Sequence, residues 1–444
     1  MAEVTYICKR TVVSTKPVQP GKYHSLSVLQ RHMEKNHTRM VYYFQSSGEV
    51  EKITKKLRES LAELLTYFPI MSGRLIRDEK GNWMVKCNDA GVRMVEARAK
   101  GSVEDWLRNV NREKELKLVH WEEMYHKQYF WSPFNVQVTE FEEGGLAVGL
   151  SCIHILADPI CATLFIRAWA NITLGQKMIA PPFFHPLPPR RPGNIKPNHQ
   201  PYTALIDHYR SSFEKSIPVM DSRYTTITLT FSDQMVRACM EMTKAQTVMS
   251  NMPLPTPFEA LAGLFWVSLS KIKGIRNGLV NMSICLDMRK VLGLDSGFFG
   301  NCMVYNKVHA VNFGEHNLSE AATAIKEVVD KMDVEGIMDL IEWLESTDSN
   351  SPSIMHGYDL ICANLEEINP YLTMFENEFT PIRASYYIEP VLGEGHVVIF
   401  PAPTVEGPLS RVVMVTLRED EAVKLCEDDL ISNYSPTILM RKCE

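Results

Sequence analysis

The chain has 444 residues, of which 45% are hydrophobic and 23% are charged, and its formal net charge at pH 7 is −6. This length favours two or three domains or one large body in two parts, because single hydrophobic cores stop growing at about 250–300 residues. The negative charge argues against a nucleic-acid-binding surface, which normally carries an excess of Lys and Arg. We therefore expect a globular protein that does not bind nucleic acid.

The cysteines and the N-terminal stretch bear on the cellular compartment. None of the ten cysteines is spaced as C-x-x-C, and no Cys/His cluster has metal-ligand spacing, so we expect reduced thiols and no metal. The opening stretch lacks the apolar core of a signal peptide, and no apolar run approaches the roughly 20 residues that span a bilayer. We expect a cytoplasmic protein without a transmembrane segment.

The first half of the chain shows a clear helix and a clear strand. In residues 49–69, apolar side chains recur on one helical face and Pro69 ends the pattern. The run "GGLAVGLSCIHIL", residues 144–156, is typical of a buried strand that follows a glycine turn. Asp158 then has the position of a helix N-cap and Pro159 that of the first helical residue, which predicts a helix that ends near Gly175.

A proline-rich segment divides the chain into two halves of similar length. Residues 180–201, "APPFFHPLPPRRPGNIKPNHQP", contain eight prolines, so neither a helix nor a central strand can run through them. We interpret the segment as a crossover between residues 1–179 and residues 202–444. Its basic pair, Arg190 and Arg191, is expected to be solvated.

The second half again interleaves helices and strands. The patterns predict a helix at 256–274, a strand at 279–288, a helix at 319–332 capped by Ser319, and a closing strand pair at 396–403 and 409–420. Alternation of this kind throughout both halves predicts a mixed α/β fold in two parts.

The stretch "SCIHILADPI", residues 151–160, places His154 at the carboxyl end of the predicted strand, four residues before Asp158. Site residues often lie at such strand ends, and a histidine there can accept a proton near neutral pH. A buried histidine kept for packing fits the same pattern, so the residues alone leave catalysis open. No G-x-S-x-G, Walker, G-x-G-x-x-G or H-E-x-x-H motif offers another chemistry.

Five stretches in one order along the chain point to a known family: "LTYFPIMSGRL" (65–75), "HILAD" (154–158), "TPFEALAGLFW" (256–266), "LDMRK" (286–290) and "FFGN" (298–301). Together they resemble the plant BAHD acyltransferases, which are coenzyme-A-dependent O- and N-acyltransferases. The resemblance covers essentially the whole chain. It implies two domains, each with a mixed sheet flanked by helices, and a tunnel between them that admits acyl-CoA and an acceptor from opposite faces.

The resemblance also implies roles for individual residues. His154 would be the general base that deprotonates the acceptor, and Thr380 falls where the family has a hydroxyl near the tetrahedral intermediate. Four residues would support the site structurally: Asp158, Asp287, Arg289 and Asn301. The family binds acyl-CoA as substrate and holds no permanent cofactor.

The chain departs from the family pattern at its C-terminal motif. Members usually carry Asp-Phe-Gly-Trp-Gly, and without a gap "VLGEG", residues 391–395, takes its place. A gapped alignment removes the motif altogether. Both alignments remove a carboxylate that normally braces the tunnel, and Glu389 is the nearest candidate to replace it. Gln30 is a smaller departure, because the family usually has aspartate there.

The segment "RASYYIEPVLGEG", residues 383–395, together with the intact H-x-x-x-D motif, is similar to the eceriferum/Glossy-type proteins of cuticular wax synthesis. That subgroup assists very-long-chain fatty-acid elongation with a membrane-bound β-ketoacyl-CoA synthase at the endoplasmic reticulum. The implied function is an accessory factor, monomeric by itself, that binds acyl-CoA on the cytosolic face of that membrane. The alternative is an active acyltransferase that uses His154 on a hydroxyl or amine acceptor, and whether the protein is an enzyme stays open.

Overall fold

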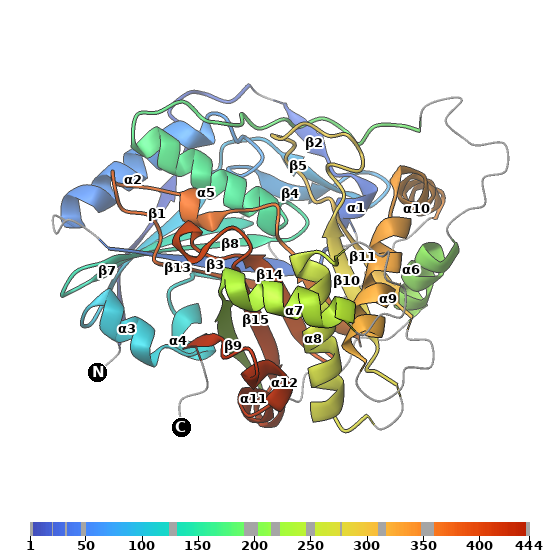
Figure 1. Cartoon of the computed structure of the whole chain (residues 1–444). Coiled ribbons are helices and arrows are strands. Elements are labelled where there is room, and N and C mark those ends of the chain that lie inside the picture. Colours follow the sequence, from blue (N-terminus) through green and yellow to red (C-terminus); the bar gives the residue numbers. More distant parts are fainter. Residues whose placement is uncertain are drawn as a thin grey trace.

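The computed structural model has the mixed α/β fold that the sequence predicts (Figure 1). It describes residues 3–19, 21–31, 33–45, 50–123, 131–190, 203–214, 223–245, 254–275, 278–309, 317–347 and 359–440. Arg191 and the rest of the crossover up to residue 202 lie outside these residues.

The strands in chain order are β1 (Val4–Val12), β2 (Tyr23–Ser25), β3 (His37–Phe44), β4 (Arg74–Arg77), β5 (Trp83–Lys86), β6 (Val92–Ala99), β7 (Phe134–Phe141), β8 (Leu146–Ile153), β9 (Tyr224–Phe231), β10 (Met282–Asp287), β11 (Met303–Val308), β12 (Leu360–Asn364), β13 (Arg383–Glu389), β14 (His396–Pro401), β15 (Arg411–Arg418) and β16 (Thr437–Met440). The predicted strand at 144–156 is β8, whose residues are all buried. The closing pair is β14 and β15, which are antiparallel as expected.

The helices are α1 (Val28–Arg31), α2 (Val50–Leu65), α3 (Val103–Asn109), α4 (Arg112–Leu116), α5 (Pro159–Thr173), α6 (Thr203–Glu214), α7 (Asp233–Ala245), α8 (Pro257–Ile272), α9 (Leu318–Lys331), α10 (Val334–Ser346), α11 (Glu419–Cys426) and α12 (Asp429–Ser432). Within the described residues, no helix combines the length and the apolar character that crossing a bilayer requires.

The cap of α9 differs from the prediction. Asn317, not Ser319, is the N-cap, and its side chain accepts hydrogen bonds from the backbone N–H groups of Ser319 and Glu320. Asn and Ser are equally good caps, so the sequence pattern does not choose between two candidates two residues apart. The predicted cap of α5 is confirmed at Asp158. Helix α8 is capped by Thr256, whose side chain accepts from the backbone N–H of Glu259.

Each half of the molecule is built around one large sheet. The six-stranded sheet has the order β1-β6-β7-β8-β3-β13, the seven-stranded sheet has the order β11-β10-β12-β14-β15-β9-β16, and β2, β5 and β4 form a small third sheet. Helices α2 and α5 lie against each other over the first sheet (Figure 1), where the indole N–H of Trp169 donates to the carbonyl of Leu57 over 3.0 Å. Helix α8 packs against β14 of the second sheet and against α9.

Strand β13 joins the two halves, because it belongs to the second half of the chain yet completes the sheet of the first. It pairs with β3 from Arg383 opposite Tyr43 to Glu389 opposite His37. In Figure 1 it lies beside β3 and β8, although its colour marks the C-terminal part of the chain. The two halves therefore share a sheet, and a boundary drawn along the sequence does not separate them cleanly.

A buried carboxylate holds β13 and β3 together. Glu115 of α4 is fully buried and accepts hydrogen bonds from the hydroxyls of Tyr43, Tyr387 and Ser385. The guanidinium of Arg383 lies 3.8 Å from the same carboxylate. Because unpaired buried carboxylates are strongly unfavourable, these donors fix the register in which the two halves meet.

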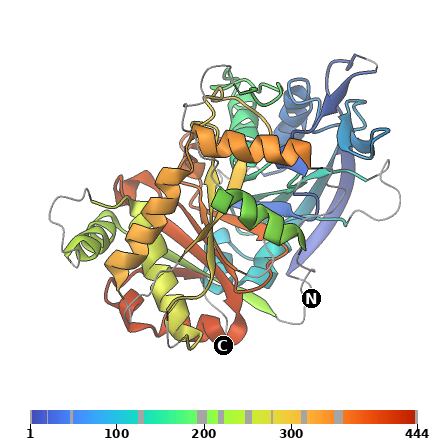
Figure 2. The same ribbon diagram turned by 90° about the vertical axis from the view of Figure 1, so that its right-hand side faces the viewer.

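The described part of the crossover is anchored by Arg190, which is not simply solvated as the sequence suggested. Its guanidinium contacts Glu335 at 2.7 Å, Asp339 at 2.5 Å and Glu342 at 2.7 Å, and its side chain is 9% exposed. All three carboxylates are on α10, which lies over α6 (Figure 2). The sequence does not indicate this contact, because the crossover and the three acidic residues are far apart along the chain.

We predict that Arg190→Gln lowers the free energy of unfolding by about 2–3 kcal/mol, because it removes charge-assisted hydrogen bonds to three carboxylates. Arg108→Gln is the control. The side chains of Arg108 and Asp105, which form an ion pair, are 73% and 56% exposed, so the loss of unfolding free energy should stay below about 0.5 kcal/mol. Urea-induced unfolding measures both. Equal effects of the two substitutions would contradict the anchoring role.

Candidate active site

His154 follows directly after β8, where the chain turns before α5. Its backbone N–H donates to the carbonyl of Asn36 over 2.8 Å, which continues the pairing of β8 with β3. The helix that follows starts at Pro159, with Asp158 as its N-cap. A buried strand, a tight turn and a capped helix thus place His154 rigidly.

The imidazole of His154 is suited to accept a proton. The side chain is fully buried, and neither ring nitrogen has a hydrogen-bond partner among the residues that the structure describes. Burial lowers the pKa of His154 below its ordinary value, and the nearby Asp158 carboxylate opposes this shift only in part. The ring is therefore neutral near pH 7. A neutral, unpaired histidine can serve as a general base once a hydroxyl or amine reaches it.

The two oxygens of Asp158 bind three partners, one within its own half of the chain and two from the second half. Oδ1 accepts the backbone N–H of Cys161 over 2.9 Å and so caps α5. Oδ2 accepts the backbone N–H of Cys302 over 3.0 Å and an N–H of Arg289 over 2.8 Å. Burial alone would raise the pKa of Asp158, but Arg289 and these N–H donors hold it below its ordinary value. The carboxylate is therefore occupied structurally and joins α5 to the second half.

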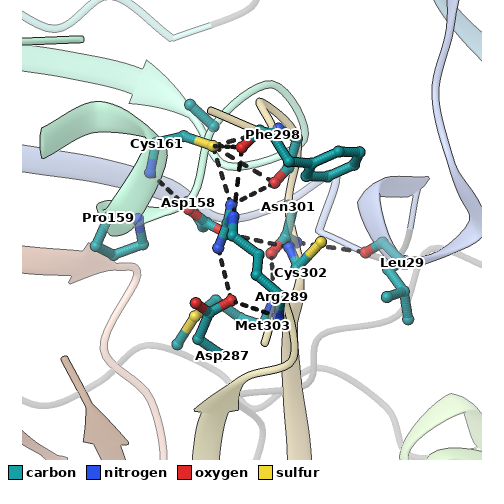
Figure 3. Close-up of polar contacts among 12 residues, drawn as sticks. Leu29, Asp158, Pro159, Cys161, Asp287, Arg289, Phe298, Asn301, Cys302 and Met303 are labelled. Carbon is teal, nitrogen blue, oxygen red and sulfur yellow. Dashed lines mark hydrogen bonds and ion pairs between the residues drawn. The ribbon is translucent and has the colours of Figure 1, made fainter. Parts of the chain in front are cut away.

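Arg289 lies at the centre of this contact (Figure 3). Its Nη1 is 2.7 Å from Oδ1 of Asp287, while its Nη2 reaches Oδ2 of Asp158 and donates to the carbonyl of Gly300 over 2.6 Å. The pKa of Asp287 is raised by burial, against the effect of Arg289. The guanidinium is almost completely buried, and two carboxylates and a backbone carbonyl bind it.

Asn301 and Gln30 hold the same region from the side of α1. The amide Nδ2 of Asn301 donates to the carbonyl of Leu29 over 3.3 Å, and its Oδ1 accepts the backbone N–H of Met303 over 2.9 Å. The amide of Gln30 donates to the carbonyl of Ile155 over 3.2 Å. An aspartate, which the family usually has at position 30, cannot donate, so this departure creates a contact to the residue after His154.

Cys161 is a member of the site that the sequence did not single out. Its sulfur accepts the backbone N–H of Gly300 over 3.2 Å and lies 3.0 Å from Nη2 of Arg289. Burial raises the pKa of its thiol, so it stays protonated. A cysteine three residues after an N-cap carries no spacing signal that would have marked it.

The segment after β13 has its own supports in place of the usual family motif. Val391 and Leu392 are buried, and Glu394 lies 2.9 Å from the ammonium of Lys273, which also contacts Glu421. Glu389, the candidate replacement for the missing aspartate, forms an ion pair with Arg112 of α4. Glu389 thus contributes to the join between the halves, away from the Asp158–Arg289 contact.

Thr380 does not reach His154. It is exposed and precedes β13, whose first residue, Arg383, pairs with Tyr43, whereas the opposite end of β13 lies beside His37 near His154. At about 3.3 Å per residue, β13 spans roughly 20 Å from Arg383 to Glu389, and Thr380 lies before its start. The ungapped alignment that suggested a contact with the intermediate therefore does not match the observed strand direction.

The described residues contain no group of three or more His, Cys, Asp or Glu side chains placed to hold a metal ion. The carboxylates of Asp158 and Asp287 are both bound by Arg289. The reactive group of the site is thus the neutral imidazole of His154, and the hydrogen bonds around Asp158 and Arg289 hold the turn that carries it.

We predict that Arg289→Gln lowers the free energy of unfolding by about 3–5 kcal/mol, because it leaves two buried carboxylates without their cation. The adjacent Lys290→Gln is a matched control, since the Lys290 side chain is 77% exposed and forms a surface ion pair with Glu367, and it should cost less than about 1 kcal/mol. Urea-induced unfolding at pH 7 compares them. A loss for Arg289→Gln no larger than the control value would show that the frame is dispensable.

We predict that His37 makes stability fall below pH 6.5. Burial, followed by the effects of Arg39, His154 and Arg112, lowers the pKa of His37 to about 2. Between about pH 2 and pH 6.5, the unfolded state therefore binds a proton at this residue and the folded state does not. The wild type should lose about 2 kcal/mol from this residue between pH 8 and pH 5, and His37→Phe should not. Urea unfolding of wild type and His37→Phe at pH 8 and pH 5 tests this. The difference between the two proteins at pH 8 measures the contacts that the substitution removes. Parallel pH profiles would refute it.

Comparison with known proteins places the chain in a family. A family model described as the transferase family matches residues 2–428. ECERIFERUM 26-like from Arabidopsis thaliana is 25% identical over 94% of this chain and 92% of its own length, and ECERIFERUM 2 is 26% identical over 96% and 97%. Rosmarinate synthase from Plectranthus scutellarioides is 28% identical over 90% of each chain.

Solved structures with the same fold agree with this placement. Vinorine synthase superposes with a TM-score of 0.70 at 17% identity, over 96% of this chain and 98% of its own. TRI101 of F. sporotrichioides, solved in complex with coenzyme A and T-2, superposes with a TM-score of 0.74 at 15% identity, over 94% of this chain and 100% of its own. The family model, the H-x-x-x-D geometry and the two joined sheets lead to one conclusion: the chain belongs to the BAHD transferase family.

Proposed function

We propose that the protein binds very-long-chain acyl-CoA between its two halves and promotes fatty-acid elongation with a membrane-bound β-ketoacyl-CoA synthase, in cuticular wax synthesis. It would act at the cytosolic face of the endoplasmic reticulum as a monomer docked on that enzyme. Acyl-CoA is its ligand, and no resident cofactor or metal is required.

The observation that carries this proposal is the rebuilt segment after β13. In place of the usual Asp-Phe-Gly-Trp-Gly, the chain has two buried apolar residues, Val391 and Leu392, and an ion pair from Glu394 to Lys273. The segment is well supported, so the loss of the acidic motif is compensated in the fold. The chain keeps the fold but lacks the motif whose carboxylate normally braces the family's tunnel. This combination suits a protein that binds acyl-CoA better than one that catalyses its turnover.

The relatives support the same role. ECERIFERUM proteins match over nearly their whole length, and the sequence resembles that subgroup at residues 383–395, where the family motif is altered.

A second candidate function, acyl transfer, is favoured by the geometry of His154. A hydroxyl or amine acceptor would give its proton to the unpaired imidazole and attack the thioester carbonyl. The C–S bond would then break, and the coenzyme thiolate would take the proton from His154, so that acyl acceptor and free coenzyme A leave. Hydroxycinnamoyltransferases and rosmarinate synthase among the relatives fit this alternative.

We predict that co-expression with a plant β-ketoacyl-CoA synthase in yeast lengthens the fatty-acyl chains relative to the synthase alone. His154→Ala should retain this effect, because guiding an acyl chain requires no proton transfer. Gas chromatography of the fatty-acyl esters measures chain length, and His154→Gln, which retains more of the side-chain volume, controls for a folding defect.

The outcomes separate the two functions. Longer chains with wild type and both variants support the accessory role. Longer chains with wild type alone, when His154→Gln is equally abundant, assign chemistry to the histidine. If wild type changes nothing, the accessory role is wrong, and purified protein should be tested for acyl transfer from acyl-CoA to hydroxyl and amine acceptors.

A further inference from the structure

The outer edge of the first sheet carries an exposed surface that the site does not use. Strand β1 is the end strand of the six-stranded sheet: β6 pairs with one side of it, and the other side has no strand among the described residues. Helix α2 packs beside it (Figure 1). Between its buried ends, Val4 and Val12, every side chain of β1 is exposed except that of Cys8, which is half-buried. This strand therefore offers most of its side chains to whatever lies outside the molecule.

Some of these exposed side chains are large and apolar. Tyr6 is 58% exposed and Ile7 is 54% exposed, and Val13, directly after the strand, is 47% exposed. Single exposed apolar residues are common on protein surfaces, whereas several along one strand form a continuous apolar stripe. The edge of the sheet is therefore suited to contact with something that is itself partly apolar.

A β-bulge in the same stretch indicates which kind of contact fits. Tyr6 and Cys8 pair with consecutive residues of β6, so Ile7 between them has no partner on that strand. A bulge interrupts the regular spacing of an edge and hinders the addition of another strand. The edge therefore suits a surface that needs no strand register better than it suits a peptide that would extend the sheet.

Cationic side chains lie next to the apolar ones. Arg10 and Arg58, which is on α2, share the carboxylate of Glu96 at 3.0 Å each. Lys9 forms an ion pair with Glu122, and both side chains are 40% exposed. Exposed pairs contribute little energy, so these cations stay available to other anions, and they outnumber the two carboxylates. We call the following residues the β1 edge surface: Tyr6, Ile7, Lys9, Arg10 and Arg58.

The charge of the whole chain favours contact through this half. Residues 1–179 contain 25 Lys and Arg against 20 Asp and Glu, whereas residues 202–444 contain 19 against 33. The first half is therefore net positive and the second is strongly negative. An anionic surface attracts the half that carries β1 and repels the other, so it orients the molecule.

We propose that the β1 edge surface is a peripheral membrane-binding site for a bilayer that contains anionic lipids. Tyr6 and Ile7 enter the headgroup region, which favours apolar and amphipathic side chains, and the cations contact the lipid phosphates. The inference deepens the proposed function and rests on it only for which membrane is bound. It gives the protein a contact with the bilayer that is separate from its contact with the partner enzyme.

Flotation of the purified protein with lipid vesicles tests the site without acyl-CoA and without turnover. Vesicles of phosphatidylcholine alone are compared with vesicles that also contain phosphatidylserine, at low and at high salt. Wild type should bind the anionic vesicles at low salt about 10-fold more tightly or better, because several cations face the lipid phosphates. High salt should remove this preference, because it screens exposed charges.

Two double variants separate the charges from the apolar contact. Lys9→Gln combined with Arg10→Gln should weaken binding to the anionic vesicles by about 10-fold or more, because each cation near the bilayer contributes about five-fold. Tyr6→Thr combined with Ile7→Thr should weaken the binding that remains at high salt, and threonine keeps the preference for a strand. Urea unfolding checks that both variants are folded.

The matched control is Lys290→Gln combined with Lys424→Gln, which removes the same charge from two exposed positions of the second half. It should bind the vesicles as wild type does. The proposal is wrong if wild type binds neither kind of vesicle, if it binds both equally at low salt, or if the control weakens binding as much as the change at Lys9 and Arg10. It is also wrong if vesicles do not bind but the detergent-solubilised synthase retains wild type and not the Lys9 and Arg10 variant, since the edge is then a protein interface.

Elongation in yeast by the Lys9 and Arg10 variant is measured in parallel. Elongation by a wild type that does not bind vesicles refutes the membrane site and leaves the proposed function standing. Vesicle binding by a wild type that does not lengthen the acyl chains refutes the proposed function and leaves the membrane site standing.

Discussion

The Asp158 carboxylate is the interaction on which the site depends. One oxygen caps α5, and the other binds Arg289 and the backbone of Cys302 from the other half of the molecule. The direction of α5 and the approach of the two halves are therefore set by the same group, four residues after His154. Burying this carboxylate is tolerated because both of its oxygens accept hydrogen bonds, one of them from a positively charged guanidinium. The turn that carries the histidine is rigid for that reason.

The halves are also joined where β13 completes the sheet of the first half. Glu115 binds hydroxyls from both strands of that pair, and Glu389 at the end of β13 binds Arg112. This second join explains how the chain tolerates the loss of the usual C-terminal motif. Residues 391–395 have their own ion pair to Lys273 and their own buried apolar side chains, so the sheets stay aligned without that motif.

The accessory role and acyl transfer depend on the same contacts between the two halves but differ in their need for His154. Both need the two halves held at a fixed separation, which Asp158, Arg289 and β13 provide. Transfer alone needs the neutral, unpaired imidazole of His154.

The sequence by itself determined the local elements and the identity of the central residues. Helical periodicity, the Asp158–Pro159 start of α5 and the apolar run of β8 are short-range signals, and each is found as predicted. The resemblance named Asp158 and Arg289 as structural supports of the site, and the structure brings them to 2.8 Å. Only the tertiary structure placed β13 in the other half's sheet, gave Arg190 three carboxylates and moved Thr380 away from His154. Those facts rest on contacts between distant segments, and local periodicity and capping contain no information about which distant segments meet.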